Sequence, residues 1–163
     1  MAFTDNMKTI TIDNIFDALV KKYDGVVEAN NWGERGLFYN PDSILPKGVY
    51  ILTVKEKDGA NDKASNLNRK DIYRLNIGVS KETFKAMYQY IPKRPAAGQI
   101  VNTGHAFDQI DTLMPHPVYG WMSWLCVLSP SLNTFEQLTP LIDEAVGLAK
   151  MKYEKKVQKR SHQ

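Results

Sequence analysis

The stretch that decides the fold is Ile72-Tyr73-Arg74-Leu75-Asn76-Ile77-Gly78-Val79, in which the residues of two faces alternate strictly. Successive side chains of a β-strand point to opposite faces of its sheet. The face that runs from Tyr73 to Val79 is therefore apolar, and the face that holds Arg74 and Asn76 is polar. This pattern predicts a strand with the core on one side and polar groups on the other, as is common in antiparallel sheets.

Other segments carry strand signals as well. Residues 49–54 are almost all β-branched or aromatic, which favours a strand. Residues 121–128 form another apolar run that predicts a strand, and the shorter runs at 26–27 and 37–39 predict brief ones. Between the third and fourth of these strands, residues 55–68 form a polar loop with few apolar residues to pack.

Helices are expected around these strands. Apolar residues at spacings of three and four predict a helix over Ile12–Lys22. Residues 81–90 follow a capping serine, Ser80, and a long helix is expected from Thr139 onward. The resulting order, α-βββ-α-β-α, has no βαβ alternation. It predicts an α+β two-layer sandwich with a mostly antiparallel sheet and helices packed on one face.

The length and the charge indicate one domain with a basic end. We expect residues 1–149 to form a single α+β domain and residues 150–163 to be a basic C-terminal helix extension or tail. The whole chain has a net charge of +3, the last 14 residues carry +5, and the remainder sums to −2. Such a tail could contact nucleic-acid phosphates. Cations at a helix C-terminus also complement the helix dipole, which is the favoured explanation here.

Several functional classes find no support in the sequence. No apolar run approaches the ~20 residues of a membrane span, and the N-terminus lacks the features of a signal peptide. We therefore expect a cytoplasmic protein with no membrane partner. P-loop, GxGxxG, HExxH, GxSxG and CxxC patterns are missing, so we expect no cofactor and no bound metal. The single Cys126 lies in an apolar run and is expected to be a buried thiol.

One group of residues could do chemistry. His105, Asp108, Asp111 and His116 place two imidazoles and two carboxylates within 12 residues. Such groups can ligate a divalent metal or act as general acid and base. The alternative, which is favoured, is that Asp108 caps a short helix and His116 bonds a loop backbone.

A second group could line a ligand pocket. Arg74 could hold a carboxylate or phosphate with its guanidinium fork, or it could be solvated and paired with an acidic neighbour. The tryptophan and tyrosine candidates could line or stack on a ligand, although aromatic residues are more often part of the core. The candidate ligand-binding residues are Trp32, Arg74, Asn76, His116, Tyr119 and Trp121.

Three motifs carry a resemblance to a known family. The runs RLNIGV at 74–79, PHPVYG at 115–120 and WLCVL at 124–128 resemble a bacterial domain family of unknown function, over residues 12–149. More remotely, the order of elements is similar to that of MmcQ/YjbR-like proteins, which implies a two-layer sandwich and for which a DNA-binding role has been proposed. The lysine expected before the tryptophan strand of that fold is missing from 115–120. The resemblance therefore transfers no catalytic or phosphate-binding residue.

The sequence leaves two functional hypotheses. The first is a non-enzymatic binding domain for a small ligand, a nucleic acid or a protein partner, and it is favoured because catalytic motifs are missing. The second is an enzyme that uses the cluster of His105 to His116 for metal-assisted or acid-base chemistry on a small substrate. Nucleic acid is the weaker partner, because the body of the chain is slightly acidic. A homodimer through an open sheet edge is a further expectation.

Overall fold

The computed structural model describes residues 8–31 and 33–161 of the chain. Six strands form one sheet in the order β1-β2-β3-β4-β6-β5, and every pairing between neighbouring strands is antiparallel. The strands are β1 (Val26–Asn31), β2 (Glu34–Tyr39), β3 (Val49–Lys55), β4 (Arg74–Gly78), β5 (Met114–Pro115) and β6 (Trp124–Leu128). The prediction of an α+β fold with an antiparallel sheet is confirmed.

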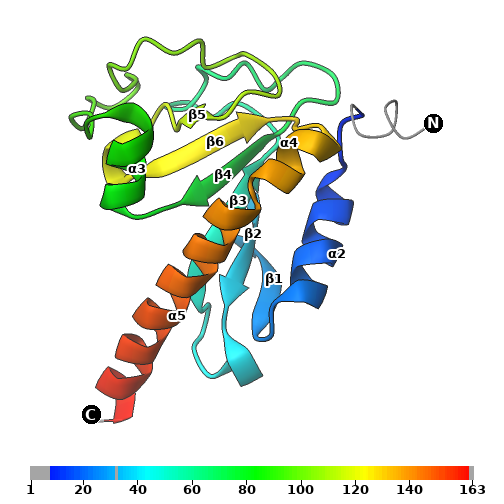
Figure 1. The fold of residues 1–163 in the computed structure, drawn as a ribbon, viewed down its shortest axis with the longest axis vertical. Coiled ribbons are helices and arrows are strands. Elements are labelled where there is room, and N and C mark those ends of the chain that lie inside the picture. Colours follow the sequence, from blue (N-terminus) through cyan, green and yellow to red (C-terminus); the bar gives the residue numbers. More distant parts are fainter. Residues whose placement is uncertain (1–7, 32, 162–163) are drawn as a thin grey trace.

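Among the described residues the helices are α2 (Ile12–Lys22), α3 (Lys81–Tyr88), α4 (Leu132–Gln137) and α5 (Thr139–Ser161), with 3-10 turns η1 (Pro41–Ser43) and η2 (Gly120–Met122). The helices α2 and α5 lie in front of the sheet in Figure 1, and α5 extends past its lower end. The predicted bounds of α2 and the predicted start of α5 are confirmed. Ser80 caps α3, because its hydroxyl accepts a hydrogen bond from the backbone N–H of Thr83 at 3.1 Å.

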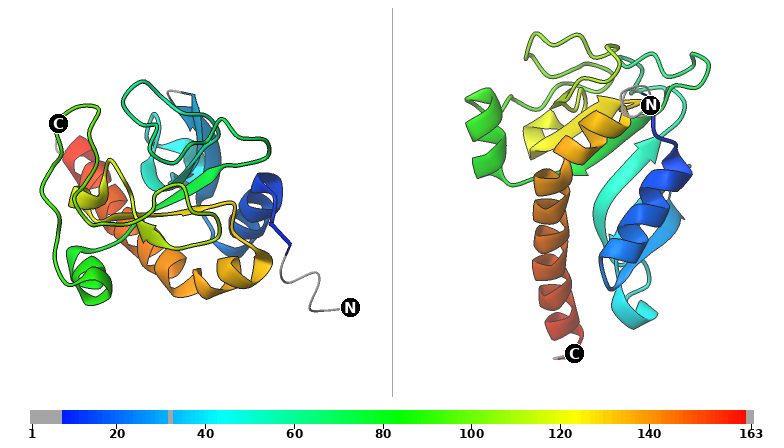
Figure 2. Two further views of the ribbon diagram at one scale, coloured as in Figure 1. Left: turned by 90° about the horizontal axis from the view of Figure 1, so that it is seen from above. Right: turned by 45° about the vertical axis from the view of Figure 1, so that its right-hand side comes forward.

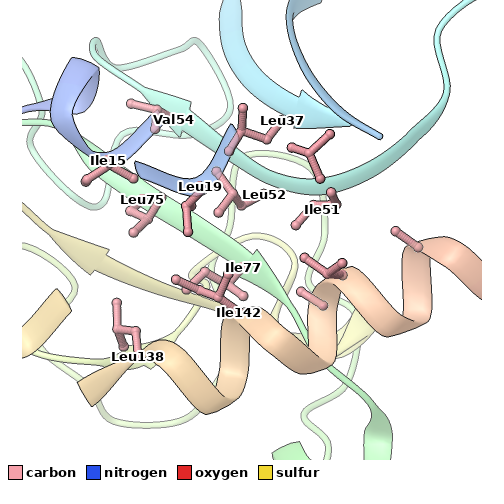
Figure 3. Packing of buried hydrophobic residues seen from close by; sticks show 14 of the residues in the cluster. Ile15, Leu19, Leu37, Ile51, Leu52, Val54, Leu75, Ile77, Leu138 and Ile142 are labelled. Atoms are coloured by element: carbon pink, nitrogen blue, oxygen red, sulfur yellow. The ribbon is translucent and has the colours of Figure 1, made fainter. Parts of the chain in front are cut away.

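The main core lies between α2, α5 and the near face of the sheet (Figure 3). The apolar face predicted for β4 is part of it, since Leu75 and Ile77 are fully buried. Burial of apolar side chains contributes roughly 25 cal/mol per Å² of surface removed from water, so this layer stabilises the fold. The labelled residues of this core are Ile15, Leu19, Leu37, Ile51, Leu52, Val54, Leu75, Ile77, Leu138 and Ile142.

A β-bulge in β3 interrupts the regular alternation of its side chains. Leu37 pairs with Leu52, but the next residue, Phe38, pairs with Tyr50, so Ile51 is an extra residue in β3. Bulges re-aim the side chains beside them. Here Ile51 and Leu52 both pack into the core, while Tyr50 turns to the opposite face of the sheet.

The strand predicted at 121–128 is shorter than expected. It begins at Trp124, and the preceding residues form the 3-10 turn η2. Ser123 ends that turn in the left-handed conformation, with φ of 67°. Tyr119 and Trp121 therefore lie before the strand, and strand spacing does not apply to them.

The N-terminal strands are longer than the apolar runs that predicted them. Strands β1 and β2 form a hairpin that continues to the pair Asn31 and Glu34, through a polar stretch. Strand β1 lies at the edge of the sheet, where one side of the strand faces no neighbouring strand. Polar residues are therefore tolerated in this strand. For this reason the apolar runs marked only the start of β1 and the end of β2.

The basic end of the chain continues α5 without a break past residue 150. Arg160 Nη1 donates a hydrogen bond to the carbonyl oxygen of Ile44 at 2.8 Å. Tyr153, which is buried, donates to the carbonyl oxygen of Pro41 at 3.4 Å. The far half of α5 is thus tied to the segment between β2 and β3. In the ranges 8–31 and 33–161, none of the helices combines the length and apolar character that crossing a membrane requires.

Candidate functional site

The face of the sheet turned away from α5 carries a cavity of about 410 Å³. Long loops between β3 and β4 and between α3 and β6 lie on this side, as the view from above in Figure 2 shows. The polar residues that line the cavity are Glu34, Thr53, Asn76 and His116. Its apolar and aromatic lining residues are Phe38, Tyr50, Tyr119, Met122 and Trp124, with Gly36 in the floor.

A row of small and polar residues crosses the middle of the floor. Gly36 of β2 lies opposite Thr53 of β3, which lies opposite Asn76 of β4. Asn76 Nδ2 donates a hydrogen bond to Thr53 Oγ1 at 3.0 Å. A β-carbon at Gly36 would come within 3.1 Å of the Phe38 ring, so the glycine keeps the floor low at this point.

A row of aromatic residues forms one end of the cavity. Phe38 and Tyr50 are cross-strand neighbours, and their ring centroids are 4.5 Å apart. Trp124 of β6 lies opposite Gly78 of β4. Because Gly78 has no side chain, the indole ring lies across β4, where a β-carbon would be only 3.2 Å from it. The result is an aromatic wall beside the polar row.

A buried ion pair lies behind the polar row. Arg74 is 1% exposed, and its guanidinium binds the carboxylate of Asp62 through two hydrogen bonds of 2.8 and 2.5 Å. It also donates to Ser65 Oγ at 3.0 Å and to Asn76 Oδ1 at 2.8 Å. Burial alone would lower the pKa of Arg74, but the Asp62 carboxylate outweighs it and the pKa lies above its ordinary value. The network continues through Asn76 to Thr53.

This network corrects two expectations. The guanidinium of Arg74 was expected to hold a ligand carboxylate or phosphate, or else to lie on a solvated face and pair with an acidic neighbour. It does pair with an acidic residue, Asp62, but that residue comes from the loop between β3 and β4, and the guanidinium is buried. That loop was expected to lack packing residues, yet Leu67 is 1% exposed and Ser65 is fully buried. The loop is therefore anchored to the sheet by Arg74, and it forms part of the cover over this face.

His116 contributes a neutral imidazole to the cavity. Its Nδ1 accepts hydrogen bonds from the backbone N–H groups of Val118 and Tyr119, both at 3.0 Å. Burial lowers the pKa of His116 well below its usual value, and the charges of Arg74 and Lys55 lower it further. The ring of Tyr119 lies beside it, with 5.1 Å between the centroids. Tyr119 and Met122 are each about half exposed and lie at the mouth of the cavity.

The four candidate catalytic residues do not converge. The backbone N–H of His116 bonds the carbonyl of Trp124, whereas that of Asp111 bonds the carbonyl of Leu128. Trp124 and Leu128 are the two ends of β6, which is about 13 Å at the usual strand rise of about 3.3 Å per residue. Asp111 Oδ1 accepts from the backbone N–H of Ser131, at the start of α4. His116 alone of the four lines the cavity.

The other two members of that group have structural contacts of their own. The His105 ring packs edge-on against Tyr88, and its Nδ1 lies 2.9 Å from Thr103 Oγ1. The carbonyl oxygen of Asp108 accepts a hydrogen bond from Arg69 at 2.9 Å. Across the part of the chain that the structure describes, His, Cys, Asp and Glu nowhere gather in a group of three that could hold a metal ion.

The ligand-binding candidates divide into three kinds. Asn76, His116 and Tyr119 line the cavity, and Arg74 lies directly behind Asn76. Trp121 lies elsewhere, packed near the small cluster of Val101, Phe107, Met114 and Cys126, with the Arg94 guanidinium 4.8 Å from its ring centre. Trp32 lies outside the described residues.

Several residues that line the cavity were not among the predicted ligand-binding residues. Glycines inside strands are a sequence signal that could have indicated some of them. Glycines inside strands often mark a close approach by another group. Gly36 and Gly78 both do so here, beside Phe38 and Trp124. Tyr50 had no such signal, because only the bulge brings it to this face.

One comparison with known proteins gives a match. A family of unknown function, DUF6194, matches residues 10–158. This range covers nearly the whole chain, which therefore belongs to that family. No curated protein and no solved structure matches the chain.

Proposed function

We propose that this DUF6194 family member is a non-enzymatic binding domain whose site is the cavity over β2, β3, β4 and β6. The observation that carries the proposal is the combination of an aromatic wall with a hydrogen-bonded polar floor around about 410 Å³. Small-molecule sites are typically clefts of roughly 300–1,000 Å³, mostly apolar, with a few fixed polar groups. The ligand class that fits is a small organic molecule with a large apolar surface.

The state of the polar groups favours binding over catalysis. General acid-base catalysis needs a group that can exchange a proton within reach of the substrate. The Arg74 guanidinium is fully engaged with Asp62 and Asn76, and His116 is held neutral with Nδ1 bonded to the backbone. Glu34 lies 3.4 Å from the Lys55 ammonium. The enzyme hypothesis loses support, because Asp108 and Asp111 do not line the cavity.

We further propose that the fold is of the MmcQ/YjbR-like type. An MmcQ/YjbR-like fold is supported by the sequence of β4, α3, β6 and α5, in which a tryptophan-bearing strand leads to the long C-terminal helix. The bacterial origin and the cytoplasmic location stay predictions. So does the division into a domain of residues 1–149 and a basic extension of residues 150–163. Nucleic-acid binding and dimerisation also stay predictions.

A fluorescence titration with the neutral probe N-phenyl-1-naphthylamine tests the proposal. We expect saturable binding to one site per chain. Replacing Trp124 by Leu removes the indole from the aromatic wall and should weaken the binding at least tenfold. Trp121→Leu is the matched control, because Trp121 lies outside the cavity lining.

Two outcomes would contradict the proposal. One is wild-type protein that shows no saturable binding of the probe. The other is an equal loss in both tryptophan variants while both keep the wild-type melting temperature, which would locate the probe somewhere other than this cavity.

A further inference from the structure

His116 presents one hydrogen-bond donor to the cavity, and the bonds to its ring fix which nitrogen carries the proton. An imidazole nitrogen that accepts hydrogen bonds carries a lone pair and no proton. Nδ1 accepts from two backbone N–H groups at 3.0 Å each, so in the neutral ring the proton resides on Nε2. The turn of Val118 and Tyr119 therefore selects the tautomer, before any ligand is present.

This donor lacks a protein partner. Within residues 8–31 and 33–161, no protein group accepts a hydrogen bond from Nε2, although His116 is only 2% exposed. Among the described residues, the buried side-chain polar atom without a partner is Ser123 Oγ, so Nε2 of His116 is not sealed inside the protein and its N–H reaches the open space of the cavity. Because His116 lines the cavity, a bound molecule is placed to supply the acceptor.

The charges around the cavity limit what that molecule can be. Glu34 is the only lining side chain that carries a full charge, since His116 is neutral, and its carboxylate lies 3.4 Å from Lys55 Nζ. The guanidinium of Arg74 is bound to Asp62 behind Asn76. A carboxylate or phosphate would find no free cation among the lining residues, and it would lie near the Glu34 carboxylate.

The aromatic wall limits its shape. Phe38, Tyr50 and Trp124 form one end of the cavity, and Tyr119 lies beside His116 at its mouth. Flat rings stack on such surfaces with a gain of about 0.5–1.5 kcal/mol per ring pair beyond the area buried. We infer that the site takes a neutral, planar aromatic molecule whose carbonyl oxygen accepts a hydrogen bond from the Nε2–H group of His116. This inference rests on the proposed function, since it specifies the ligand of the same cavity.

Three probes of similar size test the inference by isothermal titration on the full chain. Coumarin is planar and neutral and has a carbonyl oxygen. Naphthalene has the same flat shape without an acceptor, and coumarin-3-carboxylate adds a negative charge. We expect coumarin to bind about tenfold more tightly than either of the others, the factor that one satisfied buried hydrogen bond supplies.

His116→Asn is the matched variant. Its side-chain oxygen can accept from the backbone N–H groups of Val118 and Tyr119 in the manner of an Asx turn, while the Nε2–H is lost. Coumarin affinity should fall about tenfold in this variant, and naphthalene affinity should stay unchanged. Should the variant not fold, the wild-type ranking of the three probes decides alone.

The results separate the two proposals. If none of the probes binds to wild-type protein, including naphthalene, the proposed binding function fails. If all three bind with equal affinity, or if His116→Asn folds and binds coumarin as tightly as wild type, the binding function stands and the assigned ligand class is overturned. Tightest binding of coumarin-3-carboxylate would overturn the neutral class in favour of an anion.

Discussion

Gly78 of β4 and Trp124 of β6 are directly opposite each other, and the indole ring occupies the space that a side chain at position 78 would fill. A β-carbon built on Gly78 would lie 3.2 Å from Trp124 Cε2 and Cζ2. Gly78 thus allows the tryptophan to lie over its neighbouring strand. The position of this ring defines the aromatic wall of the cavity.

Gly78→Ala should displace the ring, weaken ligand binding and lower the stability of the fold. A contact of 3.2 Å requires the ring to move by a few tenths of an ångström, and overpacking of this kind typically costs about 1–3 kcal/mol. We expect N-phenyl-1-naphthylamine to bind at least threefold more weakly, together with a changed near-ultraviolet circular dichroism spectrum.

The control for this variant is Gly147→Ala. Gly147 lies in α5, and a β-carbon there would meet nothing within 4 Å. Alanine is favoured over glycine inside a helix by about 1 kcal/mol, so this variant should be more stable to urea with unchanged probe binding. Equal probe affinities in the two variants would contradict the role given to the ring.

Asp62→Asn should destabilise the protein strongly. The change leaves the buried guanidinium of Arg74 without its counter-charge, and breaking a buried ion pair from one side costs about 3–5 kcal/mol. Urea unfolding measures the loss. Because Asp62 lies in the loop over the cavity side of the sheet, the variant should also bind the probe less tightly.

Glu28→Gln provides the surface counterpart. Glu28 pairs with Arg35 at 2.7 Å, and its side chain is 43% exposed. Exposed pairs contribute about 0–1 kcal/mol, so the loss should fall in that range. A similar small loss for Asp62→Asn would mean that water reaches Arg74, and that the loop does not seal this face.

The fold was largely predictable because its main core follows local rules. Alternation placed Leu75 and Ile77 on the buried face of β4, and helical spacing placed Ile15 and Leu19 on the buried face of α2. The edge strand β1 was underestimated, because a strand with one unpaired side does not need an apolar pattern. The start of β6 was missed, because Ser123 turns the chain with a positive φ that its identity does not announce.

The site was predictable only in part, because most of it depends on long-range pairing. Asn76 and His116 were recognisable as polar residues beside apolar segments. The bond between Arg74 and Asp62 joins a strand to a loop 12 residues away, and no local pattern indicates it. The inward turn of Tyr50 depends on the register between β2 and β3, which the sequence of one strand does not contain.

The stability of the protein should decrease as the pH is lowered, and His116 should cause part of this decrease. Its pKa is lowered in the folded protein, so below about pH 6.5 the unfolded chain takes up a proton that the folded protein does not. The free energy of the unfolded state therefore decreases as the pH falls. The contribution of His116 to the stability of the folded protein is complete only above about pH 6.5. Between pH 7.5 and 5.5 this residue should account for a loss of stability on the order of 1 kcal/mol.

Urea unfolding of wild-type protein and His116→Asn at the two pH values isolates the effect. The other titrating groups are common to both proteins, so their contributions cancel in the difference. The wild type should lose more stability than the variant over this range. Equal losses would mean that His116 takes up its proton in the folded protein as readily as in the unfolded chain.

Cys126 should be unreactive in the folded protein. Its side chain is fully buried behind the polar row, opposite Asn76, and burial raises the pKa of the thiol to about 12. The thiolate is the form that attacks disulfide reagents, so both access and charge oppose the reaction. Ellman's reagent should label wild-type protein only as fast as the sheet opens, and at once in 6 M guanidinium chloride.

Met151→Cys is the matched control for this reaction. Met151 lies on α5 and is 58% exposed, so this variant should release one equivalent of thionitrobenzoate at once and the second only on unfolding. Saturating coumarin should slow the labelling of Cys126 further, because a ligand that binds only the folded protein suppresses its opening. Rapid labelling of wild-type Cys126 without denaturant would show that reagent enters from the cavity side, and that Asn76 and Met114 do not seal the thiol from it.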